Sequence, residues 1–94
     1  MELRFYEDPD TGQPHILNHG VAEDEVRQVL ANPGEDRPSS DDSRTALGQT
    51  AAGRYLRVIY VPDPGGDSAF VVTAYELQGK QLKAYRRRRR RRRK

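Results

Sequence analysis

The stretch GRYLRVIYV at residues 53–61, followed by PDPGGDS at 62–68 and AFVVTAY at 69–75, decides the fold. β-Branched and aromatic residues bounded by Pro, Gly and Asp are typical of a β-hairpin. If Tyr60 pairs with Phe70, alternate apolar residues of both strands share one face of the sheet, which then belongs to the core. A slip of one residue would mix apolar and polar positions on each face, so the pattern favours this register.

The other face of the hairpin would carry Arg57 together with Tyr55, Thr73 and Tyr75. A guanidinium between two phenols and beside a hydroxyl is suited to binding a phosphate and to stacking on a base. The alternative is an ordinary solvated sheet face with aromatic cross-strand pairs.

The length and composition limit the remaining possibilities. A chain of 94 residues has room for one domain with one small core. It has no Cys, which excludes a disulfide framework and a thiolate zinc site. The N-terminus lacks a basic-then-apolar signal pattern, and no apolar run approaches the ~20 residues that span a bilayer. We therefore expect a cytoplasmic protein without a membrane partner.

The charge is divided sharply along the chain. Nine of the 17 basic residues lie at 86–94, which leaves eight basic residues against all 14 acidic residues in the part before them. The first 85 residues thus carry a formal charge of −6 and the last nine a charge of +9. We expect a single domain at 1–85 and a polybasic tail at 86–94, largely disordered beyond any helix that carries it.

The tail has three interpretations. It could bind RNA through Arg86, Arg87 and Arg88 and their neighbours. Such binding would not depend on the RNA sequence, and its affinity would fall steeply as the salt concentration rises. It could instead fold back onto the acidic body, or it could be a polyarginine extension added by engineering.

The other segments follow from their apolar spacing. We expect a strand at 2–6 with Leu3 and Phe5 inward, a short helix at 15–19 that Gly20 ends, and a helix from Val21 that ends at 32–34. We expect a mobile loop at residues 35–43 and a strand at 44–49. From about residue 78 we expect a helix that runs into the arginines. The predicted order is β-α-α-β-β-β-α, an α+β sandwich with the helices on one sheet face.

His15 and His19 form an i, i+4 pair that could bind a metal on one helix face. A third ligand at compatible spacing and an H-E-x-x-H pattern are both missing, so we predict no metal. Glycine-rich phosphate motifs and a serine–histidine arrangement are also missing, and we expect no cofactor.

Four pieces of the sequence resemble one known family: HILNHGV at 15–21, LGQTAAGRYLRV at 47–58, VVTAY at 71–75 and KAYRR at 83–87. In order and spacing they are similar to the BrnT toxins, which belong with the RelE-like ribonuclease toxins of bacterial type II toxin–antitoxin pairs. They also resemble small uncharacterised proteins related to that group. The resemblance implies a small antiparallel sheet backed by two N-terminal helices, RNA cleavage on the open face, and inhibition by a ribbon-helix-helix antitoxin.

Chemistry of this kind is metal-independent: the RNA 2′-hydroxyl attacks its own phosphate, either in free RNA or on the ribosome. The candidate catalytic residues are Arg54 and Arg57 for the phosphate, His19 as general base, and Tyr75 as a proton donor or stacking group. The candidate RNA-binding residues are Tyr55, Thr73, Arg86, Arg87 and Arg88. Two alternatives stay open, namely that Arg54 only pairs with an acidic residue of the body, and that the domain is a catalytically silent RNA-binding or protein-interaction module of the same fold.

Overall fold

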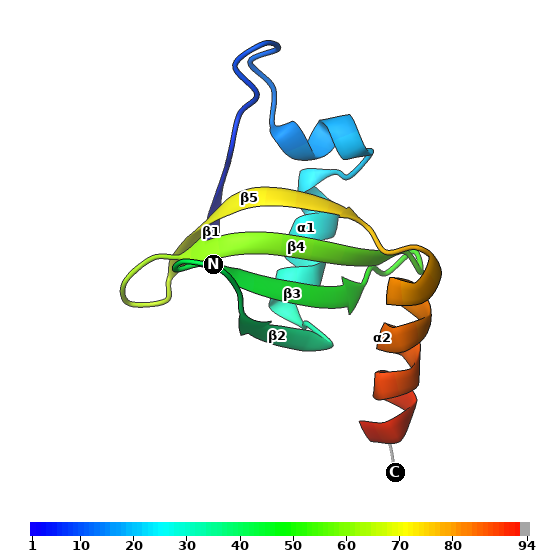
Figure 1. The fold of residues 1–94 in the computed structure, drawn as a ribbon. Helices are drawn as coiled ribbons and strands as arrows, with labels where there is room; N and C mark the ends of the chain where they lie inside the picture. The colour runs from blue at the N-terminus through cyan, green and yellow to red at the C-terminus, as the bar shows by residue number, and fades with distance from the viewer. Residues whose placement is uncertain (93–94) are drawn as a thin grey trace.

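The computed structural model describes residues 1–92 and has a five-stranded sheet at its centre (Figure 1). The sheet order is β1-β5-β4-β3-β2, in which β1 runs parallel to β5 and the other neighbours are antiparallel. The elements are β1 (Glu2–Phe5), the 3₁₀ helix η1 (His15–His19), α1 (Glu23–Ala31), β2 (Glu35–Pro38), β3 (Arg44–Gln49), β4 (Tyr55–Pro62), β5 (Ser68–Glu76) and α2 (Gly79–Arg92). The fold is therefore α+β, but the expectation of an all-antiparallel sheet is wrong because of β1.

The segment after α1 differs from the prediction. Residues 35–43 were expected to form a loop, yet Glu35–Pro38 form the edge strand β2, which pairs antiparallel with β3. An edge strand needs only one neighbour and can be polar on both faces, so it lacks the apolar alternation that marks an internal strand. Pro38 stands at the end of β2, where the lost backbone donor costs least.

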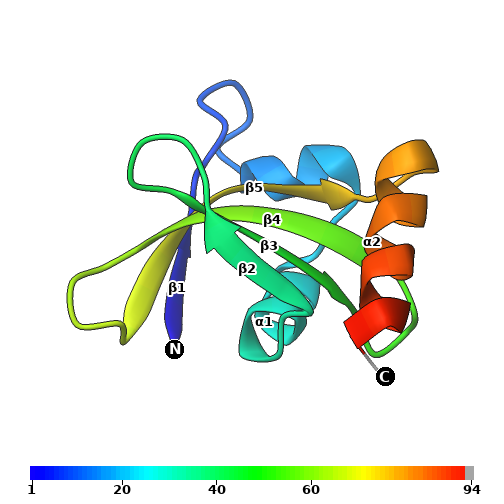
Figure 2. The same ribbon diagram turned by 60° about the horizontal axis from the view of Figure 1, so that its bottom comes forward.

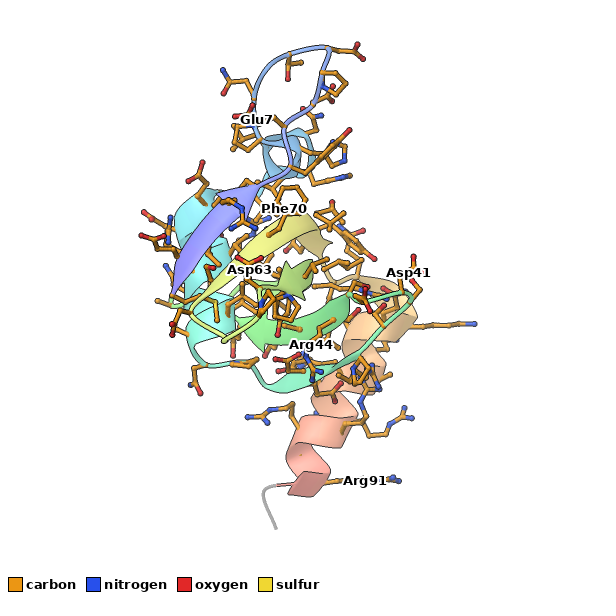
Figure 3. The ribbon with its side chains drawn as sticks, turned by 90° about the vertical axis from the view of Figure 1, so that its left-hand side faces the viewer. Glu7, Asp41, Arg44, Asp63, Phe70 and Arg91 are labelled. Atoms are coloured by element: carbon orange, nitrogen blue, oxygen red, sulfur yellow. The ribbon has the colours of Figure 1, made fainter. Side chains whose placement is uncertain are left out.

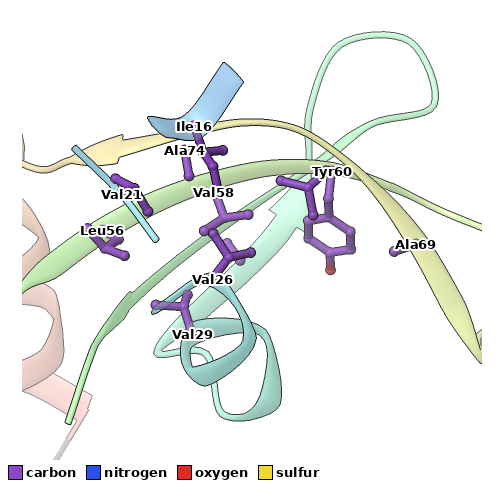
Figure 4. Packing of buried hydrophobic residues seen from close by; sticks show 11 residues of the cluster. Ile16, Val21, Val26, Val29, Leu56, Val58, Tyr60, Ala69 and Ala74 are labelled. Carbon is purple, nitrogen blue, oxygen red and sulfur yellow. The ribbon is translucent and has the colours of Figure 1, made fainter. Parts of the chain in front are cut away.

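The main core lies between one face of the sheet and the pair η1 and α1 (Figure 4). Val26 and Val29 of α1 and Ile16 of η1 are each at most 1% exposed, and they pack on Leu56 and Val58 of β4. Gly20 ends η1 with a left-handed backbone, φ 71°, as predicted. The predicted stop at Gly20 is thus confirmed, but the first of the two expected N-terminal helices is a 3₁₀ turn, and α1 is the α-helix that covers this face.

The C-terminal helix α2 packs on the opposite sheet face, so the expectation that all helices share one face is wrong (Figure 2). Tyr85 of α2 and Leu77 form a second apolar cluster with Leu47 of β3, against which Tyr55 of β4 packs. Leu47 and Tyr55 alternate with the core residues of their strands and therefore point away from α1. One face of the sheet is thus covered by α1, and part of the other by α2.

The predicted register of the hairpin is also wrong, although the hairpin itself is confirmed. Val58 pairs with Ala74 and Tyr60 with Val71, because a bulge lies between Ile59 and Tyr60. A bulge places two residues of one strand opposite one of the other, so the faces of β5 exchange at that point. Val71 is consequently fully buried while Val72 is only partly so.

The arginines of the tail continue α2 as far as Arg92, so the proposed boundary between residues 85 and 86 falls inside this helix. Arg88 donates from Nε to Glu35 Oε2 at 2.5 Å and from Nη2 to Glu35 Oε1 at 3.0 Å, and this contact raises the pKa of Arg88. At this position the tail does fold back onto the acidic body. Residues 93 and 94 lie outside the described residues. Within residues 1–92, no helix has both the length and the apolar character needed to cross a membrane.

Gly34 should control how α2 docks. A methyl group at this position would overlap the hydroxyl of Tyr85, so we expect Gly34→Ala to lower the free energy of unfolding by about 1–3 kcal/mol, as overpacking does. Urea denaturation measures this change. Adding Tyr85→Phe, which removes the overlapping oxygen, should recover part of the loss. Equal stability of Gly34→Ala and wild type would show that α2 docks in another way.

Asp63, in the turn between β4 and β5 (Figure 3), should give the stability an acid dependence. Hydrogen bonds from Arg4 (2.8 and 3.0 Å) and from Ser68 lower the pKa of Asp63 from its ordinary value of 3.8 to about 2. A carboxylate whose pKa is lowered by folding stabilises the fold above its unfolded pKa, and this contribution disappears as the pH falls through the folded pKa. The stability difference between wild type and Asp63→Asn should therefore shrink between about pH 4 and pH 2.

Thermal denaturation at several pH values measures that difference. Asp67→Asn, which removes an exposed carboxylate from the same turn, is the matched control and should show a much smaller effect. A difference for Asp63→Asn that stays constant down to pH 2 would contradict the assigned contact with Arg4.

Candidate functional site

A row of aromatic side chains runs along the outer edge of β5. The rings of Tyr6 and His15 are 5.9 Å apart between centroids, those of His15 and His19 5.0 Å, and those of His19 and Tyr75 6.1 Å. The two imidazoles meet through their Nε2 atoms at 3.3 Å, a hydrogen bond whose direction depends on the tautomers. Two hydrogen-bonded imidazoles thereby lie beside a phenol.

The topology of the sheet creates this arrangement. β1 pairs with β5 only from Ser68 to Val71, which leaves the edge of the rest of β5 free for η1, and η1 lies beside it (Figure 1). The chain between β1 and η1 forms a closed loop, because the His15 amide donates to the Tyr6 carbonyl at 2.8 Å and the Asp8 amide to the Gln13 carbonyl at 2.8 Å. This closure fixes where η1 begins and so where both histidines lie.

Asp8 of this loop lies behind the histidines. Its carboxylate accepts hydrogen bonds from the Asp10 amide at 2.9 Å and from Asn18 Nδ2 at 2.9 Å, and its Oδ2 is 3.8 Å from His15 Nδ1. The Asp10 amide contributes most to holding the pKa of Asp8 below its ordinary value, and Asn18 and His15 act in the same direction. The carboxylate is therefore charged at neutral pH and lies within ion-pair distance of the His15 ring.

Arg57 lies on the other side of Tyr75. The two residues are directly opposite each other in the β4–β5 ladder, and Arg57 Cζ is 5.9 Å from the Tyr75 ring centroid. Arg57 Nε is buried and has no hydrogen-bond partner within the described part of the chain. Arg57 also lines a pocket of about 160 Å³ with Arg37 and Arg88. Its guanidinium is therefore placed to bind an anion at this pocket.

Arg54 has a different environment. Its Nη1 donates to both carboxylate oxygens of Glu25 at 2.8 and 2.9 Å and to the Gly20 carbonyl at 3.0 Å, and its Nη2 is 3.5 Å from Glu76. The hydrogen bond to Glu25 is the main reason that the pKa of Arg54 is raised. Arg54 thus joins α1 to the sheet, as the alternative interpretation of this residue predicts.

The predicted RNA-binding residues are divided between several places. Thr73 lies opposite Ile59 and is half-buried. Tyr55 packs edge to face on Tyr85, with Arg86 above its ring at 5.8 Å. Arg88 is bound to Glu35, and Arg87 is exposed on α2. The structure therefore brings together His19, Tyr75 and Arg57 from the predicted set, whereas Arg54 is engaged by Glu25 and by the Gly20 carbonyl.

Sequence reasoning missed two parts of this site. It treated His15 only as a metal ligand, and it gave Asp8 no role. The sequence Asp8-Pro9-Asp10 does signal a turn in which an aspartate accepts the amide two residues on. Its position beside His15, however, depends on the closure of the loop. In residues 1–92, no group of three or more His, Cys, Asp or Glu side chains could hold a metal ion.

The model of one protein family, described as a domain of unknown function (DUF4258), matches residues 15–76. The matched region extends from η1 to the end of β5 and includes His15, His19, Arg57 and Tyr75. No curated protein and no solved structure matches the chain.

Replacing Arg54 should affect folding rather than chemistry. The ion pair with Glu25 is only 30% and 19% exposed, so its loss should cost more than a surface pair and less than a buried one, about 1–2 kcal/mol for Arg54→Gln. Chemical denaturation measures this loss. Arg27→Gln, which removes an exposed arginine of α1, is the control and should change the stability by less than about 0.5 kcal/mol. Full stability of Arg54→Gln would contradict the structural role.

Proposed function

The chain belongs to the DUF4258 family, and we propose that it is a metal-independent RNA-cleaving enzyme that acts as the toxin of a bacterial type II toxin–antitoxin pair. One observation carries this proposal: a histidine pair backed by Asp8 lies next to Tyr75 and Arg57, so that proton-exchanging groups adjoin an anion-binding group. The similarity of residues 15–21, 47–58 and 71–75 to BrnT toxins of the RelE-like group gives separate support, and the RelE/BrnT-like fold is part of the proposal.

In the proposed mechanism, His19 is the general base. Asp8 orients His15 so that His15 Nε2 accepts the hydrogen of His19 Nε2, which leaves His19 Nδ1 as an acceptor for substrate. His19 is exposed, so an RNA 2′-hydroxyl can reach it. His19 takes the proton as the 2′-oxygen attacks the adjacent phosphorus.

The bond from phosphorus to the 5′-oxygen breaks in the same reaction, and the phenol of Tyr75 donates its proton to that oxygen. Arg57 stabilises the negative charge that grows on the non-bridging oxygens. The products are a 2′,3′-cyclic phosphate and a 5′-hydroxyl. Transfer of the proton from His19 to the Tyr75 phenolate, whose ring centroid lies 6.1 Å away, restores the enzyme.

The proposed setting is the bacterial cytoplasm, with RNA as substrate, free or on the ribosome, and a co-encoded ribbon-helix-helix antitoxin as protein partner. An antitoxin would need to cover the row of side chains beside β5, since the proposed chemistry takes place there. An antitoxin segment that contacts the cationic α2 is expected to be acidic.

A second candidate function is a catalytically silent module that binds RNA or a protein on the same sheet face. The engagement of Arg54 by Glu25 favours it, because one of the two arginines expected at the phosphate is not available there. Purified protein that binds single-stranded RNA without cleaving it, alone and with ribosomes, would support this second function.

Substitutions at the site should separate chemistry from binding. His19→Gln and Arg57→Ala should each reduce cleavage of single-stranded RNA about 100-fold or more, because one loses the base and the other a donor to the phosphoryl oxygens. The assay contains a chelator, and binding is measured separately on 2′-O-methyl RNA, which cannot react. The affinity for that RNA should change much less than the rate.

Arg27→Ala, which removes a positive charge from the exposed face of α1, is the control for the loss of an arginine. It should cleave like wild type. Full activity of both His19→Gln and Arg57→Ala would refute the assignment of the site, and no cleavage by wild type under any of these conditions would refute the enzymatic function.

A further inference from the structure

A second hollow lies on the other side of α2 and belongs to no part of the proposed catalytic site. It has a volume of about 460 Å³ and lies between α2, the chain that joins α1 to β2, and the ends of β3 and β4. Its lining includes Gln49, Tyr55, Tyr85, Arg86, Arg89 and Arg90. We call it the α2 groove. Its size is in the range of sites that bind small molecules.

The helical period of the tail determines which arginines reach the α2 groove. Arg86, Arg89 and Arg90 are spaced i, i+3, i+4, so they share one face of α2 with Tyr85. Arg88 faces the other pocket and is bound to Glu35. None of the residues lining the α2 groove within the described chain is Asp or Glu. Three guanidiniums therefore converge on a space whose walls offer no carboxylate to neutralise them.

The groove also has an aromatic wall. The rings of Tyr55 and Tyr85 are packed edge to face with centroids 6.0 Å apart, and Arg86 lies over Tyr55. Arg89 Nη1 donates to the Gly34 carbonyl at 3.2 Å, which holds this arginine at the mouth of the groove. A surface that combines aromatic rings, a stacked guanidinium and free positive charge is typical of single-stranded nucleic-acid binding.

We propose that the α2 groove binds one nucleotide of a single-stranded RNA, with its phosphate on Arg89 and Arg90 and its base against Tyr55 and Arg86. The proposal rests on the proposed function for the identity of the nucleic acid. Tyr55 and Arg57 are two residues apart on one face of β4, about 7 Å along the strand. Because the groove and the pocket at Arg57 lie on different sides of α2, an RNA strand that occupied both would pass around this helix, and the groove would help to determine which phosphate reaches Arg57.

The test measures binding of a short 2′-O-methyl RNA by isothermal titration calorimetry, with adenosine 5′-monophosphate, adenosine and inorganic phosphate as smaller probes. Arg89→Gln with Arg90→Gln removes two charges that line the groove. Arg87→Gln with Arg91→Gln removes two charges from the same helix that do not line it and is the matched control, since both arginines are exposed and Arg91 projects away from the body (Figure 3).

We expect the groove variant to weaken binding of the RNA and of the monophosphate about tenfold, as loss of charge-assisted hydrogen bonds does, and the control variant to weaken it about twofold or less. The monophosphate should bind more tightly than either adenosine or inorganic phosphate. Equal losses in the two variants would overturn the proposal, because they would show only general attraction to the tail. Preference for an acidic peptide over all the nucleotide probes would also overturn it and assign the groove to a protein partner.

Cleavage by the same variants separates this proposal from the proposed function. If the groove variant cleaves a short RNA at the wild-type rate under saturation but with a raised KM, both proposals are supported. If the groove variant and the control variant weaken RNA binding equally, and both cleave with the kcat and KM of wild type, the groove proposal is overturned and the proposed function stands. Nucleotide binding in the groove by a wild type that cleaves no RNA would support the groove and refute the enzyme.

Discussion

The pairing of β4 with β5 across the bulge between Ile59 and Tyr60 is the constraint on which both sides of the molecule depend. On one side of the bulge, the ladder puts Val58 and Ala74 into the core and places Arg57 opposite Tyr75 on the other face. On the other side of the bulge, the exchange of faces brings Ala69 and Val71 into the same core. A regular ladder could not satisfy both requirements, because it would turn either the apolar residues or the polar site the wrong way.

Ion pairs decide which arginines remain available to a ligand. The acidic body uses Glu25 to hold Arg54 and Glu35 to hold Arg88, and each contact joins a helix to a distant segment of the chain. Arg57, Arg86 and Arg90 lie instead at the two pockets beside α2. The negative charge of the body therefore does not simply neutralise the tail, because it acts at particular positions and leaves a cationic surface on the sheet face away from α1.

Residue patterns predicted those parts of the fold that local chemistry determines. The hairpin, the strand at 44–49, the helical turn before Gly20 and the helix that runs into the arginines follow from alternation, spacing and the left-handed glycine. The bulge does not follow, since Phe70, Val71 and Val72 are all apolar and either alternation fits them. The polar strand β2 and the parallel pairing of β1 with β5 depend on neighbours far away in the sequence, which local patterns do not specify.

The same division applies to the candidate site. The sequence places Arg57 and Tyr75 on one face of the hairpin, and this is correct because the expected and the observed strand pairings both put these two residues on the same face. The prediction for His19 rests only on the chemistry of its imidazole. Arg54 was placed beside them because it lies on the same strand segment, but its partner Glu25 comes from α1, 29 residues earlier. Asp8 reaches His15 only through a closed loop. Residues whose role depends on tertiary contacts were therefore misplaced or missed.

The most direct test of the account is the chemical identity of the RNA ends that the wild-type protein produces. Attack by the 2′-hydroxyl, with His19 and Tyr75 moving the protons, predicts fragments that end in a 2′,3′-cyclic phosphate and begin with a 5′-hydroxyl, formed equally well in the presence of a chelator. Mass spectrometry of a defined single-stranded RNA after incubation identifies these ends. Fragments with 3′-hydroxyl and 5′-phosphate ends, cleavage that a chelator abolishes, or cleavage at a 2′-O-methylated nucleotide would contradict the account.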